Sequence, residues 1–243
     1  RITDRQVLVA CDLDNTLIFS YRHDIGQEKR CVEVYQGREI SFITEKTHRL
    51  LREINEKMLV VPTTTRTREQ YERITLGVGE LPFALVCNGG VLLINGKKDP
   101  EWYAHSLELV AGCRREMEKA TALLEQDPGR EMEVRYIEEL FLFTKCADPG
   151  KTVRTLQREL DTTALDVLHN GTKVYVLPKE LRKGKALQRF RKYKKACRVF
   201  AAGDSAFDVS MLEAADWAAA PDALLKRYAL PGHVAGMPGR AVF

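Results

Sequence analysis

VLVACDLDNTL, residues 7–17, is the stretch that decides the fold. Its first five residues are apolar without interruption, a pattern typical of a strand buried on both faces, because a half-exposed strand alternates apolar and polar side chains. Asp12 and Asp14 follow where this strand ends. In open parallel sheets, ligands bind in the crevice beyond the carboxyl ends of the strands. We therefore predict a catalytic site beside these two carboxylates.

The rest of the chain alternates between apolar runs and helical patterns, which predicts βαβ units and a parallel sheet. Residues 83–87 are expected to form the third strand of that sheet, and residues 184–195 a basic helix. The full set of expected strands is 7–11, 58–61, 83–87, 198–202 and 217–220, and the expected helices are 44–57, 68–76, 184–195, 209–215 and 222–228.

A different pattern occupies residues 93–178. It contains a helical period over 107–126, apolar strand character within 132–144, a helix start at Asp148-Pro149 and an Asn170-Gly171 pair between two strand-like arms. Asn-Gly between such arms is the strongest short-range signal for a β-hairpin. We predict an α/β fold with a Rossmann-like parallel core, residues 1–92 and 179–243, and an inserted α+β domain, residues 93–178.

A second hairpin is expected close to the first strand, with its turn at Gln36-Gly37. Two interpretations carry equal weight. It is either a flap that covers the crevice and excludes water, or an edge hairpin that packs on the sheet.

Composition limits the classes of protein to which the chain can belong. Of the 243 residues, 44% are hydrophobic and 30% charged, as in soluble globular proteins. No apolar run approaches the roughly 18–20 residues that cross a bilayer, and the charged start, residues 1–5, is not that of a signal peptide. The six cysteines form no CxxC pair, which predicts reduced thiols and a cytoplasmic protein.

The net charge of +4 is compatible with an anionic substrate but does not select one. The basic run 182–198 is interpreted as the solvated face of an amphipathic helix, because only Phe190 and Tyr193 could stack on bases within it. We therefore expect neither a nucleic-acid partner nor a membrane. The sequence carries no signal for the oligomeric state.

Polar side chains follow four of the expected strands. They are Asp12 and Asp14, then Thr63 and Thr64, then Asn88, then Asp204 and Asp208, with Lys183 at the start of the basic helix. Phosphoryl transfer can use all of these groups, since one carboxylate can act as nucleophile and a second as acid and base. Mg²⁺ binds carboxylates while keeping waters, and hydroxyl and ammonium groups hold phosphoryl oxygens.

These residues also carry a resemblance to a known family. DLDNT (12–16), Thr64, Lys183-Gly184 and GDSAFD (203–208) follow the order DxDxT, T, K, GDxxxD, which resembles the four motifs of the haloacid dehalogenase (HAD) superfamily phosphatases. The insertion between the second and third motifs resembles the C2 α/β cap of the Cof-type and sucrose-phosphate-phosphatase-like branch. NGG at Asn88 and KGKAL at Lys183 are similar to that branch as well.

The resemblance implies a role for each residue. Asp12 corresponds to a nucleophile that forms an aspartyl-phosphate, and Asp14 to the acid that protonates the leaving oxygen and then activates water. Thr64, Lys183 and Asn88 correspond to phosphate-binding positions. The implied Mg²⁺ ligands are Asp12, Asp14 through its backbone carbonyl, Asp204 and Asp208, the last as a direct or indirect ligand.

Several alternatives stay open. Lys185 competes with Lys183, and Asn88 could serve only the turn before Gly89. The chain also departs from the branch: it has DNT where DGT is usual, TTR where TGR is usual, and Phe207 where Asn is frequent.

The expected function is Mg²⁺-dependent hydrolysis of a small phosphorylated metabolite, such as a sugar phosphate or a nucleotide-like phosphomonoester. The alternatives are a phosphomutase of the same fold and a protein that binds a phosphorylated ligand or nucleic acid without turnover.

Overall fold

The computed structural model describes residues 7–239, which divide into two compact units. The core unit comprises the residues up to Asp99 together with those from Lys183 onward, and the inserted unit is Pro100–Arg182. The inserted unit thus begins and ends a few residues later than the segment 93–178 expected from the sequence. Within residues 7–239, every helix is too short or too polar to span a membrane.

The core unit is built on a sheet of five parallel strands in the order β15-β14-β13-β1-β5. The register places Cys11 of β1 between Ala202 of β13 and Pro62 of β5, so these three strands end at the same level. The strands are β1 (Val7–Cys11), β5 (Leu59–Pro62), β13 (Arg198–Ala202), β14 (Trp217–Pro221) and β15 (Val234–Met237).

Two features of this sheet differ from the sequence prediction. β6 (Phe83–Val86) was expected as a third parallel strand, but it pairs antiparallel with β7 (Val91–Ile94), which in turn pairs antiparallel with β8 (Lys97–Lys98). A single parallel bridge, Thr63 to Leu85, connects it to the end of β5. The fifth parallel strand is instead β15, a short edge strand with a central glycine and no apolar run.

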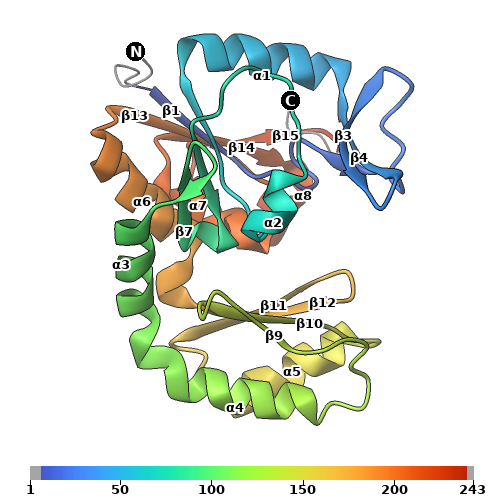
Figure 1. The fold of residues 1–243 in the computed structure, drawn as a ribbon, viewed down its shortest axis with the longest axis vertical. Coiled ribbons are helices and arrows are strands. Elements are labelled where there is room, and N and C mark those ends of the chain that lie inside the picture. Colours follow the sequence, from blue (N-terminus) through green and yellow to red (C-terminus); the bar gives the residue numbers. More distant parts are fainter. Residues whose placement is uncertain (1–6, 240–243) are drawn as a thin grey trace. The chain divides into compact units, whose positions relative to one another are not determined.

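Helices cover both faces of the parallel sheet, as Figure 1 shows: α1 lies on one face, and α6 and α7 lie on the other. Right-handed crossovers explain this, because the chain moves to one edge of the sheet after β1 and toward the opposite edge after β13. The helices of the core unit are α1 (Glu45–Lys57), α2 (Arg68–Glu72), α6 (Lys183–Lys194), α7 (Val209–Ala214) and α8 (Asp222–Arg227).

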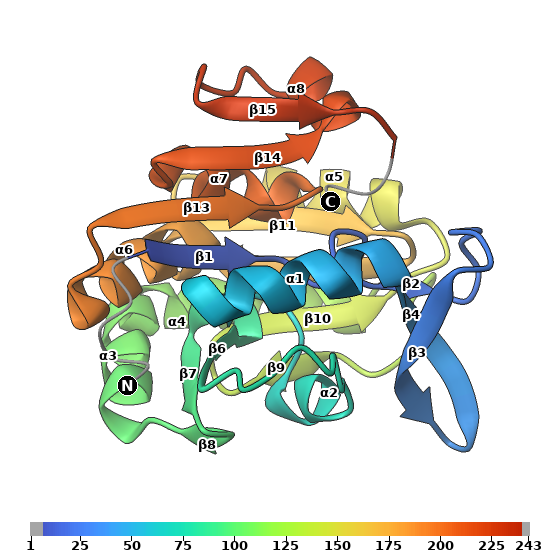
Figure 2. The same ribbon diagram turned by 90° about the horizontal axis from the view of Figure 1, so that it is seen from above.

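The predicted hairpin at Gln36-Gly37 is confirmed. β3 (Lys29–Tyr35) pairs antiparallel with β4 (Arg38–Thr44), which also pairs with the short β2 (Phe19–Ser20). Gln36 and Gly37 both have positive φ angles, 51° and 75°, as a tight hairpin turn requires. In Figure 2 the arrows of β1, β13, β14 and β15 point the same way, and the hairpin lies beyond their carboxyl ends.

The inserted unit has an antiparallel sheet in the order β11-β12-β10-β9, packed against α4 and α5 through a buried apolar cluster that includes Leu142, Leu156 and Val176. Its last residue, Arg182, donates two hydrogen bonds to Asp166 of the same unit, at 2.7 and 2.8 Å. The elements are α3 (Pro100–Val110), α4 (Arg114–Glu125), β9 (Arg135–Ile137), β10 (Phe141–Lys145), α5 (Pro149–Glu159), β11 (Leu165–Asn170) and β12 (Lys173–Pro178).

The prediction of a single helix over residues 107–126 is wrong. Two helices, α3 and α4, occupy this region, and a 3₁₀ turn at Ala111–Cys113 separates them. Gly112 lies in that turn, where its low helix propensity favours the break. The Asn170-Gly171 hairpin and the cap of α5 are confirmed, since Asn170 pairs with Lys173 and Asp148 accepts the backbone N–H of Lys151.

Glycine is required where the turn after β6 meets α6. Gly89 has φ +92°, and a Cβ built on it would lie 2.3 Å from the Cβ of Ala186. Cys87 and Asn88 before it also have positive φ angles. The turn and the first part of α6 are therefore in contact through a residue without a side chain.

We expect Gly89→Ala to destabilise the protein by more than the ~1–2 kcal/mol that a left-handed conformation costs an L-residue, because the added methyl also collides with α6. Gly96→Ala is the matched control, since Gly96 has φ +76° but open space around its Cβ position. Urea unfolding of both variants gives the comparison. If both variants lose the same free energy of unfolding, the collision of the added methyl with α6 does not contribute to the destabilisation.

Candidate active site

Asp12 lies directly after β1, and its backbone N–H donates to the carbonyl of Ala202 at 2.9 Å, so the sheet fixes its backbone. The chain then turns tightly, because the carbonyl of Leu13 accepts the N–H groups of three following residues, Thr16, Leu17 and Ile18. Asn15 adopts φ 62° in this turn. Asn tolerates the left-handed region better than most residues, which explains why DNT can replace DGT.

Lys183 is the first residue of α6, and its side chain is only 1% exposed. Its Nζ donates to Oδ1 of Asp12 at 2.9 Å and to Oδ1 of Asp208 at 2.7 Å. Gly184 allows this placement, because a Cβ there would lie 2.3 Å from the carbonyl oxygen of Ser210 in α7. Lys185, the competing candidate, is exposed.

Asp208 organises the loop after β13. Its Oδ2 accepts the backbone N–H groups of Asp204 and Ser205 at 2.9 and 3.1 Å, while its Oδ1 accepts from Lys183. Gly203 makes the loop possible, since a Cβ on it would lie 2.4 Å from that of Asp208. Both oxygens of Asp208 are thus engaged by protein donors, and its side chain is fully buried.

Asp12, Asp204 and Asp208 each place one carboxylate oxygen within 4.8 Å of the others. Thr16 joins two of them, donating to Asp204 at 3.0 Å and approaching Asp12 at 3.5 Å. A group of carboxylate oxygens fits a hard cation such as Mg²⁺, which binds oxygen ligands. Because Asp208 is engaged on both oxygens, Asp12 and Asp204 are better suited to hold the ion directly.

The acids of this cluster repel one another. Burial, followed by the charge of Asp208, raises the pKa of Asp12 well above its ordinary value, and Lys183 only partly opposes this. The same two causes raise the pKa of Asp204 to about 6. Burial alone would lower the pKa of Lys183, but Asp12 and Asp208 outweigh it and the pKa is raised. Three carboxylates against one ammonium leave a net negative charge, which a cation would offset.

The side chain of Asp14 lies apart from this cluster. Its two oxygens accept from Nε and Nη2 of Arg66 at 2.7 and 2.8 Å. Arg66 also donates to both oxygens of Glu33, at 2.9 and 3.0 Å. The sequence prediction missed Arg66 and Glu33. Arg66 is the arginine that TTR shares with the usual TGR, which was a signal for it, but Glu33 lies in a hairpin arm that alternates apolar and charged residues and gives none.

Thr64 and Asn88 meet at the ends of β5 and β6. The N–H of Asn88 donates to the carbonyl of Thr64 at 2.9 Å, and both residues are buried. The Thr64 hydroxyl accepts the backbone N–H of Arg66 at 3.0 Å. The neighbouring Thr63, which follows β5, instead donates its hydroxyl to the carbonyl of Val61 in that strand. This geometry favours Thr64 over Thr63 as a donor toward a ligand.

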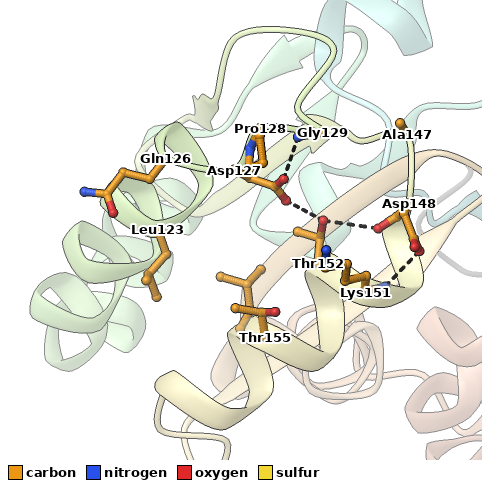
Figure 3. A pocket seen from close by; sticks show the side chains of 11 residues that line it. Leu123, Gln126, Asp127, Pro128, Gly129, Ala147, Asp148, Lys151, Thr152 and Thr155 are labelled. Carbon is orange, nitrogen blue, oxygen red and sulfur yellow. Dashed lines mark hydrogen bonds between the residues drawn. The ribbon is translucent and has the colours of Figure 1, made fainter.

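A pocket of about 400 Å³ lies in the inserted unit, between the end of α4 and the start of α5 (Figure 3). Its polar groups bond one another: Asp127 accepts from Thr152 and from the N–H of Gly129, and Asp148 caps α5. It contains none of the predicted site residues. The pocket is lined by Leu123, Gln126, Asp127, Pro128, Gly129, Ala147, Asp148, Lys151, Thr152, Thr155 and Leu156.

Comparison with known families gives one match. Residues 99–221 match the sequence profile of a family described as haloacid dehalogenase-like hydrolase, which is slightly more than half of the chain. The matched range includes Lys183, Asp204 and Asp208, whereas Asp12 and Asp14 precede it. Comparison with the sequences of curated proteins finds no match.

Solved structures with the same fold are more numerous. The sucrose-phosphatase of Synechocystis sp. PCC6803, in complex with sucrose and phosphate, is 18% identical with a TM-score of 0.65, covering 96% of this chain and 92% of that one. A HAD superfamily phosphatase from Bacteroides thetaiotaomicron is 13% identical (TM-score 0.55; 96% and 90% covered). IMP-nucleotidase from Plasmodium falciparum, bound to IMP, is 14% identical (TM-score 0.56; 84% and 59% covered). At these identities the likeness shows the fold.

The carboxylate cluster gives a pH-dependent prediction for cation binding. Because the pKa of Asp204 is about 6 and burial and Asp208 also raise the pKa of Asp12, protons compete with a cation for these carboxylates near pH 6. We therefore expect Mg²⁺ to bind more tightly as the pH rises from 6 to 8, with proton release at pH 6. Calorimetric titration in buffers of different ionisation enthalpy measures this release.

The variant Asp204→Asn should reduce the proton release because it removes one titrating ligand. The same binding enthalpy in every buffer at pH 6 would contradict the predicted displacement of protons.

Proposed function

We propose that this chain, which belongs to the haloacid dehalogenase-like hydrolase family, removes phosphate from a small phosphorylated metabolite in a Mg²⁺-dependent reaction. One observation carries the proposal: a buried lysine donates to the carboxylate that directly follows β1, inside a cluster of three acids. Sugar phosphates and nucleotide-like phosphomonoesters are the first substrates to test, since a sucrose-phosphatase and an IMP-nucleotidase share the fold.

Asp12 acts as the nucleophile. One of its carboxylate oxygens attacks phosphorus, the phosphorus–oxygen ester bond breaks, and an aspartyl-phosphate forms. Lys183 donates to Asp12 Oδ1, so the other oxygen of Asp12 is the one directed to phosphorus. The sheet and the turn at Asn15 hold the backbone of Asp12, which keeps the nucleophile in place throughout the reaction.

Asp14 moves the protons. Its protonated carboxyl donates to the leaving oxygen as the ester bond breaks, and the resulting carboxylate then accepts a proton from the water that attacks the aspartyl-phosphate. That second step releases inorganic phosphate and restores Asp12. With a side chain 45% exposed, Asp14 is accessible to a leaving group, while Arg66 fixes its orientation.

Positive charge and hydroxyl groups stabilise the phosphoryl oxygens. Lys183 supplies an ammonium group, and the Thr64 hydroxyl, which accepts from the N–H of Arg66, has its own hydrogen to donate. A bound Mg²⁺, held by Asp12 and Asp204, would neutralise the cluster and offset charge on the phosphoryl group. Asp208 holds Lys183 and the loop of Asp204 in position.

We expect Asp12→Asn to lower phosphate release by at least about 10³-fold, because the amide cannot replace the carboxylate as nucleophile. The variant should not unfold at a lower temperature, because burial and the charge of Asp208 make the ionised Asp12 unfavourable. Phosphate release from a panel of sugar phosphates and nucleotides with Mg²⁺ is the measurement. Glu53→Gln, an exposed change on α1, is the control.

Four results would contradict the proposal. If the wild-type protein releases no phosphate from the panel, the proposed hydrolase function is wrong. If Asp12→Asn keeps wild-type activity, Asp12 is not the nucleophile. Isomerised sugar phosphate in place of free phosphate would identify a phosphomutase. Ligand binding without turnover that survives Asp12→Asn would identify a binding protein.

A further inference from the structure

The guanidinium of Arg66 is shared between Asp14 and Glu33, and all of its N–H groups are used. Arginine has five such donors in a fixed planar arrangement. Two bond Asp14, two bond Glu33, and the fifth bonds the carbonyl of Gln70 at 3.2 Å. Arg66 therefore has no donor left for a phosphoryl oxygen, and its role in this arrangement is to hold carboxylates.

Glu33 is the fixed end of this network. Its side chain is fully buried, whereas that of Asp14 is 45% exposed. Besides Arg66, it accepts from Nε of Arg73 at 3.1 Å and from the hydroxyl of Ser41 at 2.5 Å. Burial alone would raise the pKa of Glu33. The hydrogen bonds from Arg66 and Ser41, with the charge of Arg66, outweigh burial and lower the pKa, so the carboxylate is charged.

The backbone of the hairpin directs Glu33 inward. The pairing of β3 with β4 is irregular on both sides of this residue, and such bulges re-aim a side chain. Glu33 also pairs with Ile74 in an isolated bridge, and Thr75 donates its N–H to the carbonyl of Val32 at 2.8 Å. The hairpin is thus attached to the segment after α2 at the point where Glu33 reaches Arg66.

Charge balance makes the network depend on Glu33. Two carboxyl groups, those of Asp14 and Glu33, bond two guanidinium groups, those of Arg66 and Arg73. If Glu33 lost its charge, Arg66 would keep its bonds to Asp14 but would no longer be held by the buried carboxylate. The guanidinium could then move together with the more exposed Asp14 side chain. The orientation of Asp14 is therefore set by a residue that does not contact it.

We infer that Glu33 is a positioning residue for proton transfer, which holds Arg66 and through it keeps Asp14 directed at the leaving oxygen. The inference rests on the proposed phosphatase function and assigns a role in it to the hairpin. Glu33 lies at the far end of a chain of hydrogen bonds from the reacting atoms, so its effect falls on the step that needs a proton.

Leaving-group dependence tests this role. An alkyl phosphate needs a proton on its leaving oxygen, whereas nitrophenolate leaves p-nitrophenyl phosphate without one. We expect Glu33→Gln to lower kcat/KM for an alkyl phosphate about 10–100-fold, and that for p-nitrophenyl phosphate by less than about threefold. Since Asp14 also activates water, an initial burst of nitrophenol should appear as hydrolysis of the aspartyl-phosphate becomes slow.

Two further variants check that the effect passes through Arg66. Arg66→Lys keeps the charge but loses the paired donors, so it should give the same dependence on the leaving group. In the double variant Glu33→Gln/Arg66→Lys, kcat/KM for the alkyl phosphate should fall by less than the product of the two single fold-losses, because both changes break the same network. Glu39→Gln, an exposed change on the same hairpin, is the matched control and should leave both reactions unaltered.

The outcomes separate the inference from the function it rests on. If the wild-type protein with Mg²⁺ hydrolyses neither ester, the proposed function fails and the role of Glu33 fails with it. If the wild type is active and Glu33→Gln lowers both reactions equally or lowers neither, the inference alone is overturned. If circular dichroism shows that Glu33→Gln does not fold, the two esters are compared with Glu33→Asp instead. This variant keeps the negative charge, but its shorter side chain does not reach Arg66.

Discussion

The ion pairs of Lys183 are the interaction on which the rest of the core unit depends. Its ammonium is buried between Asp12 and Asp208, and the three charges come from the start of α6, the end of β1 and the loop after β13. Removing the ammonium would leave two buried carboxylates without a compensating charge, which is strongly destabilising, so each of these elements has to keep its place around Lys183. The glycines beside the site follow from this requirement: Gly184 lets α6 approach α7, and Gly203 lets the loop close around Asp208.

Two charge networks of different character meet at residues 12–14. The network of Asp12 has an excess of carboxylates, which raises the pKa values of Asp12 and Asp204 and favours a cation. The network of Asp14 has two guanidinium groups for its two carboxyl groups, and it extends into the β3–β4 hairpin. Only Leu13 separates Asp12 from Asp14 in the sequence, yet the turn after β1 places the two aspartate side chains in different electrostatic environments. Pairs of titratable groups in contrasting environments are the usual basis for distinct roles of nucleophile and acid.

Local patterns predicted much of the fold because they follow from the burial of short segments. The apolar run before Asp12 and the one before Gly203 both form central strands, and their polar ends lie within bonding distance of Lys183. An apolar run does not reveal its neighbours, however, so β6 could not be assigned to a separate sheet. β15 was missed because an edge strand with one buried residue needs no apolar run. Glu33 could not be found, because its contact with Arg66 spans 33 residues and depends on a bulge. The catalytic and binding roles of the site residues remain predictions.

The peptide bond between Arg182 and Lys183 joins two side chains that are held with different strength. Arg182 ends the inserted unit with two hydrogen bonds to Asp166, and Lys183 begins the core segment with two ion pairs. Two successive cationic side chains are therefore anchored in different units, on either side of one peptide bond. A change in the backbone dihedrals beside this bond would release Arg182 more readily than Lys183, because the ion pair of Arg182 is partly exposed and those of Lys183 are buried. The ammonium of Lys183 therefore stays between Asp12 and Asp208, and the more exposed guanidinium of Arg182 is the group that can change its partner.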